Sequence, residues 1–174
     1  MKIVVGFGNP GQQYGFTRHN FGFLALDFYA KVEGSEWKRE EKFLADVARD
    51  GDTLLVKPRT FYNGVGESIQ RLSQFYKLDV AEDLLVVADD FDLPFGELRF
   101  RRGGGAGGNN GLKSAILHLG REDFARLRVG TDDAELRQRL GDVDFVLAKF
   151  TPAEKAELPK ILQNVVEIVK NPPK

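Results

Sequence analysis

The sequence predicts an α/β fold: a single globular domain over residues 1–174, built on a twisted, mixed and mostly parallel sheet that is flanked by helices. Short apolar runs suited to buried strands alternate with segments of helical periodicity, which is the order expected when helices connect parallel strands. The hydrophobic share of 42% and the charged share of 29% are ordinary for a globular protein. No repeat and no long linker divides the chain.

Three strands and two helices are predicted in the first half of the chain: strand 3–5, helix 21–32, strands 43–48 and 53–57, and helix 65–76. Asn20 is suited to cap the first helix. Asp50-Gly51 is a typical hairpin turn between the second and third strands. In the second helix we expect Ile69, Leu72 and the aromatic pair 75–76 to face the core.

The second half is predicted to hold strands 84–88, 98–102 and 127–129 and helices 111–119 and 152–169. The run 89–94 is expected to be a loop that follows a central strand. The polar stretch 130–141 is expected to be another loop, with room for one helical turn. Functional loops should gather where the parallel strands end, because the carboxyl ends of such strands share one edge of the sheet.

Composition narrows the function. The formal net charge of −1 means that any nucleic-acid site must be a local basic patch. The absence of cysteine excludes thiol nucleophiles, iron–sulfur clusters and cysteine-held zinc. No run approaches the roughly 18 apolar residues of a membrane helix, and the amino terminus does not resemble a signal peptide. We therefore expect a cytoplasmic protein with no membrane partner.

Two glycine-rich loops invite comparison with nucleotide-binding motifs. Residues 6–11 match G-x-G-x-x-G after a strand, but Pro10 removes an amide and no apolar helical period starts inside the loop. This disfavours an NAD-dependent oxidoreductase. In the second loop Leu112 separates Gly111 from Lys113, which breaks the P-loop pattern. The glycines at 103–108 form either a flexible turn or a backbone surface that meets an extended ligand.

The chain has two histidines, so the search for a base that works near neutral pH is short. His118 lies among apolar residues near a helix end, where a structural role is expected. His19 lies in a polar loop. No G-x-S-x-G elbow and no H-E-x-x-H motif is present, so water activated by His19 is the simplest hydrolytic mechanism. The acidic run Asp89, Asp90 and Asp92 could supply the acceptor that orients this base, or form a solvated turn or a magnesium site.

Together these segments resemble bacterial peptidyl-tRNA hydrolase. The resemblance rests on four motifs in a fixed order, over about three quarters of the chain: residues 6–11 with Tyr14 and 17–20, then 57–63, then 89–94, then 101–111. Four ordered motifs are far more specific than any one of them.

The resemblance implies hydrolysis of the ester between a peptide and the terminal adenosine of tRNA, by a monomer, with no metal and no cofactor. It assigns His19 as the base, Asp89 as the residue that orients it, and Asn9 as a third catalytic residue. It implies contacts with the substrate, its acceptor end or its phosphates for seven more residues: Tyr14, Phe61, Asn63, Asn110, Arg99, Arg101 and Arg128. The alternative is an RNA-binding relative that has lost turnover.

The sequence departs from the family pattern near these motifs. Ala88 and Ala106 stand where histidines are usual, Asn109 stands where another histidine is usual, and Tyr62 stands where methionine is typical. None of these departures replaces the expected base, its aspartate or the three asparagines. We expect them to alter the peptide-side subsites and the rate.

Overall fold

A seven-stranded sheet organises the chain, and the computed structural model describes residues 1–174 in full. Its strands, in the spatial order β2-β3-β4-β1-β5-β7-β6, have these bounds: β1 (Lys2–Gly6), β2 (Lys38–Glu40), β3 (Ala45–Asp50), β4 (Thr53–Pro58), β5 (Leu84–Pro94), β6 (Leu98–Arg102) and β7 (Ala125–Asp132). The four central strands β4, β1, β5 and β7 are parallel to their neighbours in this group, whereas β3, β2 and β6 pair antiparallel at the two sides. The predicted α/β class with a mixed sheet is confirmed.

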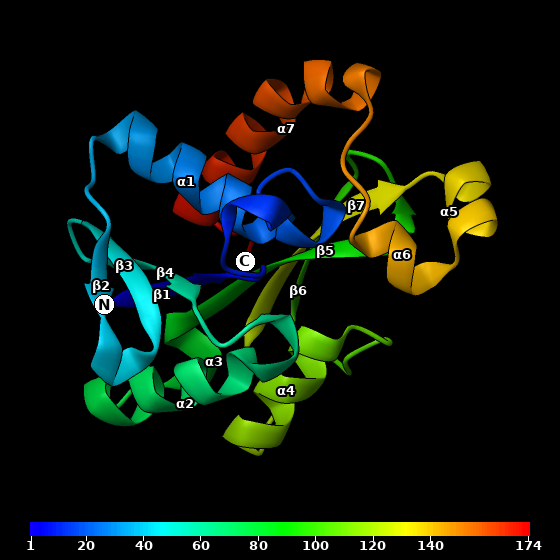
Figure 1. The fold of residues 1–174 in the computed structure, drawn as a ribbon. Helices are drawn as coiled ribbons and strands as arrows, with labels where there is room; N and C mark the ends of the chain where they lie inside the picture. The colour runs from blue at the N-terminus through cyan, green and yellow to red at the C-terminus, as the bar shows by residue number, and fades with distance from the viewer.

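Helices cover both faces of this sheet (Figure 1). Their bounds are α1 (Phe21–Glu33), α2 (Val65–Tyr76), α3 (Val80–Asp83), α4 (Asn110–Leu119), α5 (Ala134–Leu140), α6 (Asp142–Val146) and α7 (Pro152–Lys170). Helices α1 and α7 pack on one face, α2 and α4 on the other, and each face has its own buried apolar cluster. None of the helices combines the length and the apolar character needed to cross a bilayer.

Most predicted elements are present, and two predicted loops are wrong. Strand β5 continues through 89–94, because Asp89 and Asp90 still pair in parallel with Val129 and Gly130 of β7. The run 130–141 is not a loop either, because β7 extends to Asp132 and α5 follows. The side chain of Asp133 accepts a hydrogen bond from the backbone of Leu136 and so caps α5.

Two expectations about individual side chains are also wrong. Phe75, predicted to face the core, is 57% exposed and lies edge-on to Phe43 at the surface of α2, while Ile69 and Leu72 are fully buried. Asn20 occupies the position before α1, but its side chain makes no capping hydrogen bond. The side chain binds the loop after β1 instead, with a consequence for the site described below.

Close packing between α1 and the sheet determines where the polar turn before α1 lies. A Cβ atom added to Gly22 would be 2.3 Å from the backbone nitrogen of Phe7 and 2.4 Å from the carbonyl oxygen of Val87. Only glycine permits such an approach, so the first turn of α1 rests directly on the residue after β1 and on the first half of β5. The short 3-10 turn Arg18–Asn20 is thereby held beside the carboxyl end of β5.

Candidate active site

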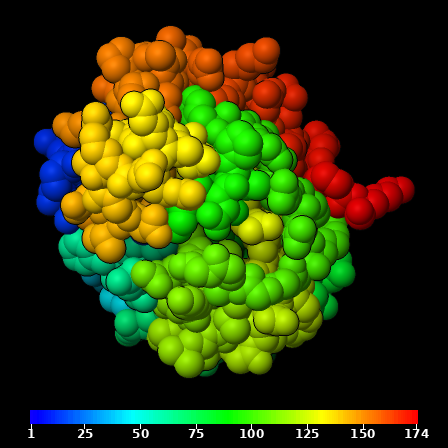
Figure 2. Space-filling view, turned by 90° about the vertical axis from the view of Figure 1, so that its right-hand side faces the viewer, coloured from blue at the N-terminus to red at the C-terminus, as the bar shows by residue number.

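The predicted polar residues converge where the parallel strands end. Asn9 follows β1, Asn63 follows β4, Asp89 lies within β5, and His19 comes from the turn before α1. Asn110, the first residue of α4, faces them. His19, Asp89 and Asn110 line a hollow that Figure 2 shows between the yellow-orange α5–α6 segment, the green β5–β6 segment and the yellow-green start of α4, whereas Asn9 and Asn63 line a second pocket beside it. The hollow is a pocket of about 210 Å³.

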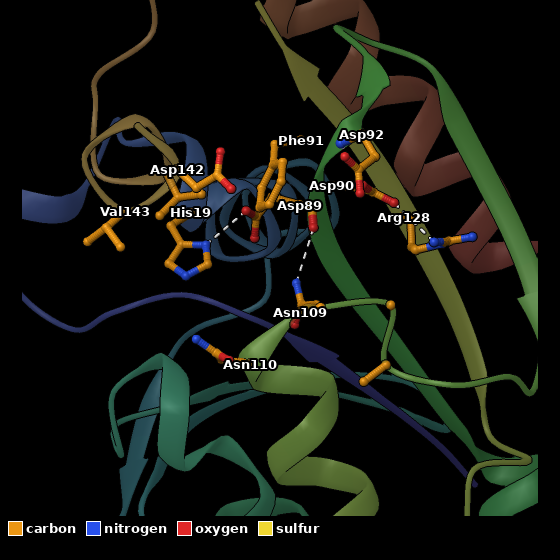
Figure 3. Close-up of a pocket in the computed structure, with 14 residues that line it drawn as sticks. His19, Asp89, Asp90, Phe91, Asp92, Asn109, Asn110, Arg128, Asp142 and Val143 are labelled. Carbon is orange, nitrogen blue, oxygen red and sulfur yellow. Dashed lines mark hydrogen bonds and ion pairs between the residues drawn. The ribbon is translucent and has the colours of Figure 1, made fainter. Parts of the chain in front are cut away.

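His19 and Asp89 form a hydrogen-bonded pair at the wall of this pocket (Figure 3). The Nδ1 atom of His19 lies 2.8 Å from Oδ2 of Asp89. The carboxylate is buried, whereas the imidazole is 14% exposed and lines the pocket. Because a carboxylate only accepts hydrogen bonds, Nδ1 carries the proton and the lone pair of neutral His19 is on Nε2. This is the tautomer that a general base needs.

Asn9 is held by three hydrogen bonds that fix the direction of its amide. Its Oδ1 accepts from the backbone nitrogen of Tyr62 at 2.8 Å, so its NH₂ group is the end left for the site. Its backbone N–H and carbonyl bind the side chain of Asn20, each at 2.9 Å. Asn9 is buried and lines a second, more open pocket together with His19. Its NH₂ group can therefore donate to an oxygen bound beside His19.

Tyr62 is part of the site, which the sequence reasoning missed. Its ring stacks on the imidazole of His19 with centroids 3.4 Å apart and planes 11° apart. Its hydroxyl donates to Oδ1 of Asp89 at 2.7 Å. Burial, followed by the negative charge of Asp89, raises the pKa of Tyr62 well above its usual value. Tyr62 thus contacts both His19 and Asp89, and its place in the site is not confined to the peptide-side subsites. The feature of the sequence that could have pointed to Tyr62 is its hydroxyl group, since a buried phenol needs a hydrogen-bond partner.

Asn109, another departure from the family pattern, completes this network. Its Nδ2 donates to the hydroxyl of Tyr62 at 2.7 Å and to the backbone carbonyl of Asp89 at 3.3 Å. Its Oδ1 accepts from the backbone nitrogen of Leu112 at 2.9 Å and caps α4. The side chain thus joins the amino terminus of α4 to the hydroxyl of Tyr62 and to the backbone of β5.

The remaining aspartates of the acidic run have separate partners. Asp90 accepts a hydrogen bond from Arg128 at 3.1 Å, and Asp92 lies 3.4 Å from Arg137. Asp89 is engaged by His19 and Tyr62, as described above. No three His, Asp or Glu side chains of the chain lie where they could hold a metal ion together. The three aspartates therefore serve different partners, and they do not form a cluster of ligands.

The second pocket opens between aromatic side chains. Phe61 is 54% exposed, and Tyr14 meets its ring edge-on with centroids 6.5 Å apart. Asn63 and Asn110 line the same pocket, and both are exposed. Phe61 has φ 59° and ψ 163°, a backbone conformation that side chains rarely adopt. The residues predicted to meet the acceptor end and the peptide are thus brought together.

The three predicted phosphate contacts lie on one face of the β6–β7 pair. Arg99 is directly opposite Arg128 in the antiparallel register, and Arg101 is two residues further along β6. Alternate residues of a strand share a face, so the three guanidinium groups project to the same side of the sheet. Arg128 lines the first pocket, where it is paired with Asp90. Arg99 is paired with Glu97 at 3.0 Å, and Arg101 is exposed with no ion pair.

The glycine-rich segment before α4 needs its glycines. Gly103, Gly104, Gly107 and Gly108 all have positive φ values, between 59° and 119°. The buried guanidinium of Arg126 donates to the carbonyls of Gly104 and Gly105 and holds the segment against β7. Burial lowers the pKa of Arg126. Gly107 and Gly108 also line the pocket.

Comparisons with known proteins place the chain in one family. A family model described as peptidyl-tRNA hydrolase matches residues 3–172. The peptidyl-tRNA hydrolase of Bacillus cytotoxicus is 44% identical over 161 residues, which are 91% of this chain and 85% of that protein. That of Chloroflexus aggregans is 40% identical over 172 residues, 97% of this chain and 90% of that protein. The crystal structure of peptidyl-tRNA hydrolase from Acinetobacter baumannii has a TM-score of 0.87 and 32% identity, and covers 98% of this chain and 87% of that one.

Proposed function

The chain belongs to the peptidyl-tRNA hydrolase family and hydrolyses peptidyl-tRNA, and we propose that His19 performs this reaction as a general base held by Asp89. The observation that carries the proposal is the 2.8 Å contact between His19 Nδ1 and Asp89 Oδ2 at the wall of a pocket. It leaves Nε2 free to take a proton from water.

His19 alone accounts for both proton transfers of the hydrolysis. As the oxygen of water bonds to the ester carbonyl carbon, Nε2 of His19 takes a proton from that water. Negative charge then develops on the carbonyl oxygen, where the NH₂ groups of Asn9 and Asn110 are placed to donate. The bond from carbon to the ribose oxygen breaks, and the imidazolium returns its proton to that oxygen. The products are a free peptide and tRNA with its terminal hydroxyl restored.

Asp89 has an electrostatic and an orienting role. A buried carboxylate stabilises the imidazolium that forms when His19 takes the proton, and it keeps Nε2 directed at the pocket. An ester of tRNA is already an activated acyl compound. One base and an oxyanion site are therefore sufficient, with no covalent intermediate.

Two parts of the site are suited to contact the tRNA: the aromatic pocket and the arginine side chains of β6 and β7. Tyr14 and Phe61 offer aromatic surface on which the terminal base of the acceptor end can stack, and Asn63 adds an exposed amide beside them. The guanidinium groups of Arg99, Arg101 and Arg128 lie on one face of the sheet, as phosphate contacts require. One copy of the chain supplies every residue in this scheme, so we propose that the enzyme acts as a monomer.

The test is release of free tRNA from N-acetyl-aminoacyl-tRNA, with a chelator present, by the wild type and by His19→Ala. We expect cleavage by the wild type and loss of at least about a hundredfold in kcat for His19→Ala, with tRNA affinity retained. His118→Ala is the matched control, because His118 binds the carbonyl of Ser114 within α4 and lines neither pocket of the site. Full activity of His19→Ala would refute the proposal.

A further inference from the structure

We propose that Tyr62 is a positioning residue of the hydrolysis: it holds the Asp89–His19 pair from two sides, and Asn109 orients its hydroxyl. The inference rests on the proposed role of His19 as the base. Tyr62 and Asn109 are both departures from the family pattern, and they are hydrogen-bonded to one another at 2.7 Å. Tyr62 and Asn109 therefore act together.

The first contact is between rings. Because the rings of Tyr62 and His19 are almost parallel and 3.4 Å apart, the imidazole cannot rotate about its own bond without striking the phenol. This contact holds Nδ1 in line with Asp89 and directs Nε2 at the pocket. Tyr62 is itself immobilised, since it is fully buried and its ring meets Phe7 edge-on. A Cβ added to Gly111 would lie 2.8 Å from the tyrosine ring, so α4 packs directly against it.

The second contact is the hydrogen bond between the Tyr62 hydroxyl and Asp89, and the neighbouring hydrogen bonds determine which group donates. Asn109 Oδ1 is occupied by the backbone N–H of Leu112, so the group that meets the tyrosine oxygen is the NH₂. The hydroxyl accepts that hydrogen bond and has one proton of its own, which goes to Oδ1 of Asp89. The raised pKa of Tyr62 keeps that proton on the hydroxyl. Asp89 thus receives one hydrogen bond on each oxygen, from Tyr62 and from His19.

Donation by the tyrosine has a chemical consequence for the base. It withdraws negative charge from Asp89, so the carboxylate stabilises the imidazolium of His19 less strongly than it would alone. A methionine at this position could not donate. The other charged groups that line the pocket with His19 are Asp90 and Asp92 on β5, Asp142 on α6 and Arg128 on β7, and the neighbouring Arg18 is paired with Glu154 of α7. The change Tyr62→Phe replaces none of them.

The tyrosine also reaches the other side of the site. Its backbone nitrogen donates to Oδ1 of Asn9, which turns the NH₂ group of Asn9 toward the reacting carbonyl. One residue therefore touches the base, the carboxylate and a proposed oxyanion donor. Removal of the hydroxyl alone separates these roles, because Tyr62→Phe keeps the stacked ring and the backbone contact.

The experiment compares Tyr62→Phe with the wild type in two measurements. The first is an NMR titration of the imidazole resonances, in which His19 reports on the inference and His118 is an internal reference, since the chain has only these two histidines. The second is the pH profile of kcat and KM for N-acetyl-aminoacyl-tRNA, corrected for spontaneous ester hydrolysis. Tyr29→Phe is the matched control, because its hydroxyl also donates to an aspartate, Asp50, at 3.0 Å, outside the site.

We expect the titration midpoint of His19 in Tyr62→Phe to move to higher pH by about 0.5 to 1 unit, with His118 unchanged. The acid limb of kcat/KM moves by the same amount, kcat falls about tenfold and KM stays within about twofold. Asn109→Ser, which keeps a capping residue for α4 but removes the donor, moves the midpoint in the same direction by less. Asn109→Ser also tests the inference if Tyr62→Phe does not fold.

The outcomes separate the inference from the function on which it rests. An unchanged His19 midpoint and an unchanged kcat in Tyr62→Phe overturn the inference, even if His19→Ala is inactive and the proposed function holds. A loss of kcat with an unmoved midpoint also overturns it, because that loss would be merely structural. Activity in His19→Ala overturns the proposed function, and the NMR midpoint still decides whether Tyr62 controls the ionisation of His19.

Discussion

The side chain of Asn20 binds the backbone of Asn9 at both ends, accepting from its N–H and donating to its carbonyl, each at 2.9 Å. These two hydrogen bonds, here called the clasp, hold the loop after β1 against the turn that bears His19. This pairing takes the place of the helix cap predicted for Asn20.

Asn20→Ala should release the loop that carries Asn9. Two buried backbone groups of Asn9 lose their partners, which should lower the free energy of unfolding by about 1–3 kcal/mol. We expect kcat to fall about tenfold, because the donor of Asn9 moves away from the carbonyl oxygen. Asn164→Ala, an exposed position on α7, is the control. Equal kcat for the two variants would mean that the clasp does not position Asn9.

Arg18 and Glu154 should contribute to stability far more than the ion pairs at the surface. The side chain of Arg18 is fully buried, binds the carbonyl of Lys149 and pairs with Glu154 of α7. Arg18→Ala leaves the carboxylate without its partner, and we expect a loss of about 3–5 kcal/mol in urea unfolding. Arg71→Ala removes an exposed pair with Glu67, for which we expect at most about 1 kcal/mol. A similar loss in both variants would contradict the assigned burial.

We expect the backbone conformation of Phe61 to lower the stability of the folded protein, while its aromatic ring contributes to substrate binding. Its backbone conformation is one that glycine adopts freely and other residues adopt at an expense of about 1–3 kcal/mol. Phe61→Gly and Phe61→Ala both lose the aromatic ring, so both should raise KM. The glycine variant alone loses the strain and should have the higher melting temperature. A melting temperature of Phe61→Ala equal to or above that of Phe61→Gly would show that the backbone is unstrained.

Arg101 should be the phosphate contact that is easiest to measure. It is exposed and has no ion pair, whereas Arg99 and Arg128 are each shared with a carboxylate. Arg101→Ala should weaken tRNA binding and reduce the slope of log affinity against log salt by about one. Arg71→Ala, on a helix away from the site, should leave that slope unchanged. Identical slopes for Arg101→Ala and the wild type would place Arg101 outside the tRNA interface.

The free energy of unfolding should decrease in alkaline solution because the pKa of Tyr62 is raised in the folded protein. Burial holds its pKa in the folded protein well above 10, while the unfolded chain loses the proton near pH 10. Above that pH the folded protein binds more protons than the unfolded chain, so the free energy of unfolding decreases as pH rises. The slope from this one group is about 1.4 kcal/mol per pH unit. Urea titrations from pH 9 to 11 should give a shallower decline for Tyr62→Phe, and an equal decline would refute this coupling.

The strands that form the centre of the sheet could be predicted from the sequence because their apolar runs are continuous, as in β1 and the first half of β5. The second half of β5 could not. Asp89 and Asp90 are polar residues typical of a turn, yet their backbone continues the ladder with β7. Tertiary pairing overrides local preference there.

The candidate site, too, could be predicted from the sequence only in part. The motifs predicted which residues would converge, because the ends of parallel strands share an edge and His19, Asp89 and Asn9 all lie there. The motifs could not predict the contacts of Tyr62 and Asn109. Both residues depart from the family pattern, and their hydrogen bonds cross from one segment to another over 47 positions. Such a contact exists only once the chain has folded.

The Arg18–Glu154 pair also links the two ends of the chain. All proposed catalytic side chains lie within the first 110 residues, yet Arg18, the neighbour of His19, finds its partner 136 positions later. The same guanidinium binds the carbonyl of Lys149. The turn that bears His19 is therefore anchored to the segment at the start of α7, so a change that loosens the carboxyl-terminal helix should disturb the base as well as the core.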